Sequence, residues 1–442
     1  MKIVKNPIAQ LSRRQLLGLG LAAALPGFSP PAAAQSQNPR RLFSIFLRGG
    51  WDSHLGSDPV LGSRLSSGNF AGAYASLATA AVSGKPQLVL GAGLLPMVDV
   101  LAEVPTAFVN GIFVEVSAHE IAYNYMMSTR LSLSRSREFP CLAALLASAQ
   151  SSYPPHVVLG ASLPLGETRA SHPPLQASSI DQIAQLLRGP GRAAWNKLKP
   201  ETLGRSHALL EALDQLAAAR LSPAQASALA PWNSAQAGLT GLYGRDLGAA
   251  LELSETIKNR YGIGEPWQLE GQIAGAFLAL SKGVSPYVTV IPQGNFDTHS
   301  SHFSLQKPLL ERTARVIAKI LSDMRVTPDP DRPDLKLIET TTVMISSEFV
   351  RTPQLNAAQG TDHWQSASAI LIGAGVEDGQ VLGATGQDAM PLGWQNGAPT
   401  GLNQETALRP EYLGAALLQS MGRPELALTI SDRPLRGLLK GV

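Results

Sequence analysis

The chain has 442 residues, with 36 lysines and arginines, 33 aspartates and glutamates, and a single cysteine. One cysteine excludes an intramolecular disulfide, and a chain of this length can bury a large core without one. Four of the basic residues and none of the acidic ones lie in residues 1–34, so the remainder carries 32 basic against 33 acidic residues. This balance gives no indication of a nucleic-acid partner.

Residues 1–34 have the three parts of an export signal. Arg13 and Arg14 form a twin-arginine pair, an apolar run extends from Leu16 to Phe28, and three alanines at 32–34 offer a cleavage site. The run is shorter than the roughly 20 residues of a helix that spans a bilayer. We therefore expect a removed signal, export to the periplasm or the medium, and a mature chain of residues 35–442 without a transmembrane segment.

Short apolar runs alternate with helical patterns along the mature chain, which indicates an α/β/α sandwich with a mainly parallel sheet. The expected strands are 42–47, 88–90, 107–116, 157–159, 287–291, 341–345 and 369–372, the last two as buried parallel strands. The expected helices are 94–102, 118–130, 303–324 and 411–421. Residues 179–279 are rich in alanine, leucine and glutamine, and we expect a helical insertion there with helices over 180–187, 207–220 and 247–261.

Carboxylates and imidazoles follow several of these strands, where ligands bind in open α/β sheets. The candidate metal ligands are Asp52, Asp297, His299, His302, Glu348, Asp362 and His363. Such groups suit one or two divalent cations, because zinc accepts nitrogen and carboxylate ligands, while calcium, magnesium and manganese prefer oxygen. The alternative is that Asp297 and Asp362 cap helices or turns and that the histidines are ordinary polar loop residues.

A nucleophile and anion-binding groups can also be proposed. Ser117 stands where strand 107–116 meets the next helix, and a hydroxyl there faces backbone N–H groups, although serine is equally a favoured N-cap. His119 is a base, a ligand or a simple helix-face residue. Arg351 and Arg48 are candidates for holding an anionic substrate, and either could instead pair with Glu348. The chain has no Gly-x-Ser-x-Gly, which argues against a metal-free serine esterase.

Three stretches together resemble a known family. Arg48-Gly-Gly-Trp-Asp52, Phe296-Asp-Thr-His299, and Ser347-Glu-Phe-Val-Arg-Thr-Pro353 followed by Gly360-Thr-Asp-His363 are similar to the exported bacterial "domain of unknown function 1501" family. That family is placed in the alkaline phosphatase and sulfatase superfamily. The chain departs from the family pattern at Trp364, where glycine is usual, and at Ser117-Ala-His119, where Ser-His-Phe is usual.

The resemblance implies an alkaline phosphatase-like sandwich with a two-metal site. By analogy, Asp52 and Glu348 would serve one metal with the nucleophile, and Asp297, His299 or His302, and His363 would serve the other. The expected activity is hydrolysis of a small anionic ester or glycan substrate, a phosphate or sulfate ester. The chain lacks the Cys or Ser followed by x-Pro-x-Arg of formylglycine sulfatases, which argues against a true sulfatase. The competing hypothesis is a non-catalytic periplasmic binding or assembly protein on the same fold.

Overall fold

The computed structural model describes residues 41–133, 139–148, 156–161, 163, 174–188, 247–401 and 403–442. All of them belong to one compact unit, Asn38–Val442. The expected export signal, the expected helix 207–220 and most of the expected insertion lie outside the described residues.

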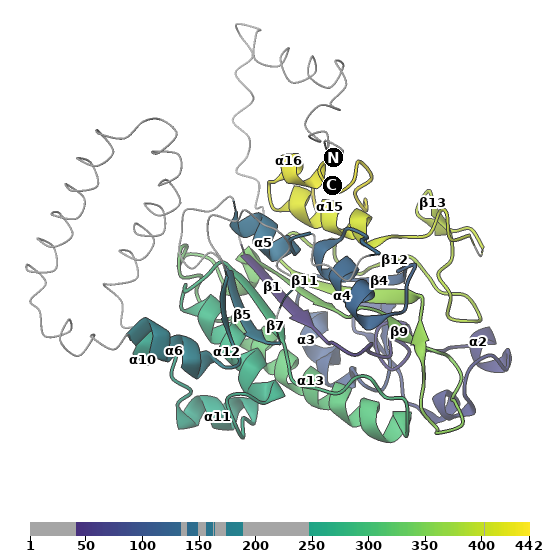
Figure 1. The fold of residues 1–442 in the computed structure, drawn as a ribbon, viewed down its shortest axis with the longest axis horizontal. Coiled ribbons are helices and arrows are strands. Elements are labelled where there is room, and N and C mark those ends of the chain that lie inside the picture. Colours follow the sequence, from purple (N-terminus) through teal and green to yellow (C-terminus); the bar gives the residue numbers. More distant parts are fainter. Residues whose placement is uncertain are drawn as a thin grey trace, which may run out of the picture. The chain divides into compact units, whose positions relative to one another are not determined.

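An eight-stranded sheet forms the centre of this unit, in the order β12-β4-β11-β8-β1-β7-β5-β6 (Figure 1). Its strands, in chain order, are β1 (Arg41–Phe46), β4 (Thr106–Phe113), β5 (His156–Gly160), β6 (Leu175–Ala177), β7 (Tyr287–Ile291), β8 (Thr341–Ser346), β11 (Ser366–Gly373) and β12 (Gln380–Leu382). All neighbouring pairs are parallel except the two that involve β11. The predicted mainly parallel sheet is therefore confirmed.

The direction of β11 corrects one prediction. Both 341–345 and 369–372 form buried strands, but β11 runs antiparallel to β8 and to β4. The connection between β8 and β11 holds the small antiparallel hairpin of β9 (Val350–Arg351) and β10 (His363–Trp364) in place of a crossover helix. A parallel return requires such a crossover, so the chain instead re-enters the sheet from the edge at which β8 ends.

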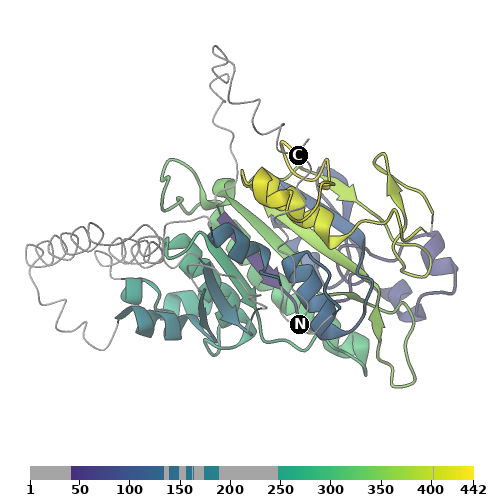
Figure 2. The ribbon, with the colours of Figure 1, turned by 45° about the horizontal axis from the view of Figure 1, so that its top comes forward.

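Helices cover both faces of the sheet (Figures 1 and 2). Alternate residues of each central strand enter different hydrophobic clusters, as the period of two requires. Phe43 and Ile45 of β1 pack in the cluster that contains α12 (Leu269–Ser281) and α13 (His302–Met324). Leu42 and Phe46 pack in the cluster that contains α4 (His119–Ser128), α5 (Leu142–Ala147) and α15 (Pro410–Ser420). The result is an α/β/α sandwich.

The remaining elements are short. They are α2 (Ser63–Ser66), η2 (Gly72–Ser76), η3 (Leu95–Met97), α3 (Val98–Ala102), α6 (Ile180–Arg188), α10 (Leu247–Ala250), α11 (Glu255–Tyr261), α14 (Leu337–Thr340), α16 (Pro424–Ala427), the hairpin of β2 (Ala80–Val82) with β3 (Lys85–Leu90), and the hairpin of β13 (Trp394–Gln395) with β14 (Ala398–Pro399). The single helix expected over 247–261 is wrong, because two helices form and Ser254 caps the second through Ile257 N. The strand expected at 88–90 lies in a separate hairpin, outside the main sheet.

Among the described residues, none of the helices combines the length and the apolar character needed to cross a membrane.

Candidate metal centre

The polar segments expected at the strand ends meet at one edge of the sheet. The chain leaves β1, β4, β7 and β8 at their carboxyl ends there, and the β9–β10 hairpin joins β8 to the amino end of β11. This edge is where parallel sheets bind ligands. The antiparallel course of β11 brings its flanking residues to the same edge.

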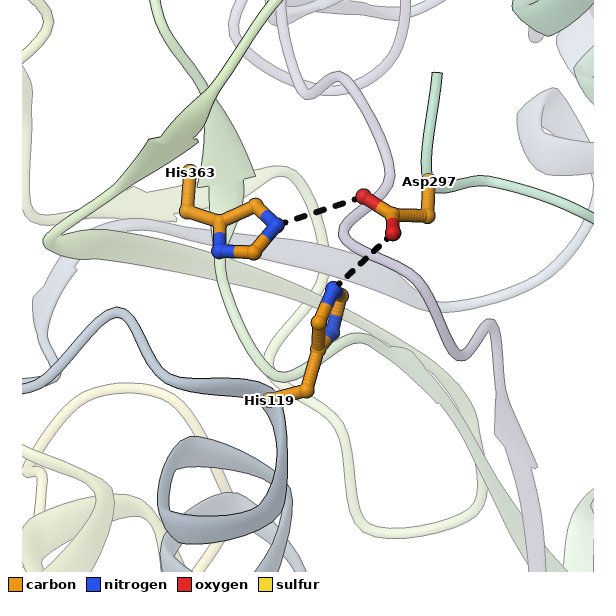
Figure 3. A group of neighbouring side chains, drawn as sticks. All are labelled: His119, Asp297 and His363. Atoms are coloured by element: carbon orange, nitrogen blue, oxygen red, sulfur yellow. Dashed lines mark hydrogen bonds and ion pairs between the residues drawn. The ribbon is translucent and has the colours of Figure 1, made fainter. Parts of the chain in front are cut away.

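Three side chains from separate segments converge there: His119, Asp297 and His363 (Figure 3). One ligand atom of each lies within 4.8 Å of the others. His119 Nε2 is 3.3 Å from Asp297 Oδ2, and His363 Nε2 is 3.2 Å from Asp297 Oδ1. His119 is the first residue of α4, Asp297 lies in the loop after β7, and His363 begins β10.

His299 adds a third imidazole from the exposed side. Its Nε2 lies 2.9 Å from Asp297 Oδ1 and 3.0 Å from His363 Nε2. Its side chain is 46% exposed, whereas those of His119 and His363 are 26% and 23% exposed. We call His119, Asp297, His299 and His363 the imidazole cluster. Solvent therefore reaches this cluster most readily beside His299.

Each imidazole of the cluster has its other nitrogen against an acceptor. His119 Nδ1 is 2.8 Å from Glu348 Oε1, and His363 Nδ1 is 2.8 Å from the carbonyl oxygen of Ser117. His299 Nδ1 is 2.7 Å from Asp362 Oδ1. Carboxylates and carbonyls only accept, so Nδ1 of each ring carries a hydrogen, and Nε2 is the nitrogen of each ring that faces Asp297. Metal-binding histidines are held in this way.

Charge in the cluster is unevenly distributed. Burial raises the pKa of Asp297, but the hydrogen bond and charge of Arg351, with the charges of His119 and His299, lower it to about 2. Burial opposes protonation of His119, but its hydrogen bond to Glu348 and the carboxylate charges raise its pKa. Burial and the charge of His119 lower the pKa of His363. An ionised carboxylate thus lies beside a neutral imidazole, the protonation states that metal ligands require.

The buried Asp52–His302 pair lies apart from this arrangement. Asp52 Oδ2 accepts from the Tyr74 hydroxyl at 2.7 Å and lies 2.8 Å from His302 Nε2. His302 Nδ1 lies 2.7 Å from the hydroxyl of Thr298 and 2.9 Å from that of Thr361. Burial raises the pKa of Asp52, but His302, His54 and Tyr74 lower it to about 2. Among the described residues, neither Asp52 nor His302 belongs to the group of close ligand atoms formed by His119, Asp297 and His363.

Glu348 and Asp362 touch the cluster from outside it. Glu348 is fully buried and uses Oε1 for His119 and the N–H of Gly49, and Oε2 for the hydroxyl of Ser347. Asp362 is 56% exposed, and the hydrogen bond from His299 lowers its pKa. Both carboxylates therefore orient histidines in this structure.

The two arginines expected to hold substrate are paired with protein groups. Arg351 is fully buried and donates to Asp297 Oδ1 at 2.5 Å. Arg48 donates to Glu120 Oε1 at 2.8 Å and stacks over the ring of Tyr123. Neither arginine pairs with Glu348.

Ser117 lies beside the cluster, since its carbonyl oxygen contacts His363, and its side chain is half-buried. It is not the N-cap of α4: that position belongs to Ala118, which makes no side-chain cap. His119, which sequence reasoning left open between base, ligand and helix-face residue, points into the cluster. The signal for it was its place two residues after Ser117, shortly beyond the end of a strand whose carboxyl end lies at the ligand-binding edge.

Trp364 does not lie on the cluster side of its hairpin. In the β9–β10 pair, His363 is opposite Arg351 and Trp364 is opposite Val350. Successive residues of a strand face opposite sides, so Trp364 points away from His363. It packs instead against the hydrophobic core on the α13 side.

The donor set fits a divalent metal ion. Three imidazole Nε2 atoms and one carboxylate are a ligand set that zinc accepts. His119 Nε2 is itself buried and has no hydrogen-bond partner, despite its 3.3 Å contact with Asp297. A buried polar atom without a partner is unfavourable, and coordination of a metal would satisfy it.

Comparisons with known proteins found distant solved structures and one family. No curated protein matches the sequence. Similar solved structures include one described as Ps i-CgsB in complex with k-i-k-neocarrahexaose (TM-score 0.37, 8% identity, 87% of this chain and 72% of that one). Another is a protein in the alkaline phosphatase superfamily from Vibrio parahaemolyticus (TM-score 0.30, 9% identity, 78% and 64%). A third is the lipoteichoic acid synthase LtaP from Listeria monocytogenes (TM-score 0.35, 7% identity, 91% and 95%).

The family comparison covers more than half of the chain. Residues 103–393 match the family described as "Protein of unknown function (DUF1501)". The matched range contains β4, the imidazole cluster and the β9–β10 hairpin. The chain therefore belongs to the DUF1501 family.

Proposed function

We propose that this protein is an exported, metal-dependent hydrolase of phosphate or sulfate esters whose metal is held by the imidazole cluster. One observation carries the proposal: three imidazoles each hold Nδ1 on an acceptor and turn Nε2 toward the carboxylate of Asp297. Histidines that bind a metal are held in this way, with one ring nitrogen on an acceptor and the other turned toward the metal position. Export rests on the twin-arginine pattern at Arg13 and Arg14.

The donor set favours zinc over calcium or magnesium, because three of the four donors are nitrogen. A bound divalent ion would supply Lewis acidity toward an anionic ester. The chain's own residues prepare the site for it. Asp297 is kept ionised by Arg351, while Glu348, Asp362 and the Ser117 carbonyl fix the three ring orientations.

Ser117 is the proposed nucleophile. It lies next to His363, and its side chain is partly accessible. Attack of its oxygen on phosphorus or sulfur would break the ester bond and release the alcohol. The serine ester would then be cleaved by water to give inorganic phosphate or sulfate and free Ser117.

One observation favours a second candidate, a metal-binding protein without hydrolase activity. Both arginines that sequence reasoning assigned to substrate oxygens have protein partners, Arg351 in the interior and Arg48 at Glu120. If neither arginine binds the substrate, the metal ion would have to balance the negative charge of an anionic ester. The two candidates differ in turnover and agree in metal content.

The test measures both quantities on the exported protein. We expect about one equivalent of zinc per chain and turnover of an aryl phosphate or aryl sulfate. Asp297→Asn should lower both, whereas Asp432→Asn, which changes an exposed carboxylate in the C-terminal segment, should lower neither. Ser117→Ala should keep the metal and lose turnover. Metal without turnover supports the second candidate, and the absence of metal overturns both.

A further inference from the structure

Arg351 connects the segments that carry the imidazole cluster. Its Nε donates to the carbonyl of Gly50 at 2.9 Å, and its Nη1 donates to that of Thr361 at 3.1 Å. Its Nη2 donates to Phe296 O at 2.9 Å, to Gly49 O, and to Asp297 Oδ1 at 2.5 Å. One guanidinium thus joins the turn after β1, the loop after β7 and the residues before β10.

The guanidinium has little capacity left for a ligand. Of its three nitrogens, each donates to at least one protein acceptor, and the side chain is fully buried. The ring of Phe349 also lies beside it, 5.9 Å from the guanidinium carbon. To reach a substrate oxygen, Arg351 would have to abandon buried carbonyls, and unpaired buried carbonyls are costly.

We infer that Arg351 is a positioning residue that fixes the carboxylate of Asp297 toward the three imidazoles and does not bind substrate; this rests on the proposed metal-dependent function. The planar fork sets the direction of Asp297 because its other bonds fix the guanidinium to three backbone segments. A lysine has the charge without the fork, so it restores the charge but not the geometry.

This inference predicts that a change of Arg351 weakens metal binding but not substrate binding. In Arg351→Met, we expect cobalt(II), used as a coloured substitute for zinc, to bind about 10- to 100-fold more weakly. We also expect an altered visible spectrum, because the ligand field depends on where Asp297 points. The KM for an aryl ester in the residual active fraction should stay near that of the wild type. Arg351→Lys should recover part of the cobalt affinity, and Arg315→Met, an exposed arginine of α13, should leave it unchanged.

The double variant with Asp297→Asn tests whether Arg351 acts through that carboxylate. If it does, the Arg351→Met effect on cobalt affinity should nearly vanish when Asp297 is already changed. Wild-type cobalt affinity and spectrum in both Arg351 variants, with KM raised, would identify a substrate-binding arginine and overturn the inference alone. If Arg351→Met fails to fold, Arg351→Lys decides by the same measurements. A wild-type protein that takes up no cobalt overturns the proposed function as well.

Discussion

Gly49 shows how a single residue supports the cluster. Its φ is +117°, and a Cβ added there would lie 2.7 Å from the backbone nitrogen of Asp297. We therefore expect Gly49→Ala both to destabilise the fold and to displace Asp297, which urea unfolding and zinc titration would detect. The matched control is Gly84→Ala, with φ of +75° and open space around it, where only the backbone strain of about 1–2 kcal/mol applies. Equal losses at both positions would contradict a role for close packing at Gly49.

His156 makes a second prediction at this scale. It is buried in β5, its Nε2 lies 2.9 Å from Thr289 Oγ1, and burial lowers its pKa to about 3 from 6.5. Below pH 6.5 the unfolded chain therefore binds a proton that the folded chain does not. This removes about 1.4 kcal/mol of unfolding free energy per pH unit until the pH approaches 3.

The measurement is urea unfolding of His156→Gln between pH 8 and pH 4.5. The difference in unfolding free energy between wild type and variant should shrink as the pH falls, since only the wild type carries this term. Thr289→Val, which removes the hydroxyl but keeps the imidazole, should lose stability by a similar amount at every pH. If the difference in unfolding free energy between wild type and His156→Gln does not change with pH, the pKa of His156 is not lowered in the folded protein.

Residue types at strand ends could be predicted from the sequence, but their partners could not. The sequence pattern predicted that Asp52 and Asp297 both follow strands. Both do lie at the edge of the sheet where the parallel strands have their carboxyl ends. Only the structure shows that Asp52 contacts Tyr74 and His302 while Asp297 faces three imidazoles. The difference arises from side chains far away in the sequence, which a local pattern does not contain.

At the scale of elements, burial was predictable and direction was not. The β-branched run at 341–345 predicted β8, which ends one residue later, at Ser346. The run at 287–291 predicted β7, whose observed bounds are the same as the predicted ones. The run at 369–372 gave a strand as well, but composition reports that a strand is buried and not which way it runs. The hairpin of β9 and β10 decides that direction, and its two-residue strands are too short to produce a periodic signal.

The Asp52–His302 pair fastens the turn after β1 to the first residue of α13. Asp52→Asn weakens the hydrogen bonds that the Asp52 carboxylate accepts, and a hydrogen bond to a charged group contributes about 1.5–3 kcal/mol, so we expect a loss of stability on that scale. Because the pair lies apart from the cluster, the variant should lose less zinc affinity than Asp297→Asn does. Glu255→Gln, which breaks an exposed pair with Lys258, is the control and should leave stability nearly unchanged. A greater loss of zinc affinity in Asp52→Asn than in Asp297→Asn would make Asp52 a ligand.

For the whole molecule, the cluster joins segments that are distant in the sequence. His119 begins α4, Asp297 and His299 follow β7, and His363 belongs to the hairpin before β11. A metal ion bound by all of them would be bound only by the folded chain, so it should stabilise the fold as a whole. At a free zinc concentration one hundred times the Kd, this stabilisation is about 2.7 kcal/mol.

We therefore expect the melting temperature of the metal-free protein to rise by several degrees with zinc and to fall again with a chelator. Magnesium should have little effect, because it prefers oxygen ligands and the cluster is mostly imidazole. His363→Ala should abolish the zinc dependence while keeping a cooperative transition, since His363 is partly exposed and contributes little to the core. Scanning calorimetry at fixed protein concentration measures all three. A wild-type melting temperature that ignores both zinc and chelator, or a His363→Ala protein that keeps the full zinc response, would show that the imidazoles converge for a reason other than metal binding.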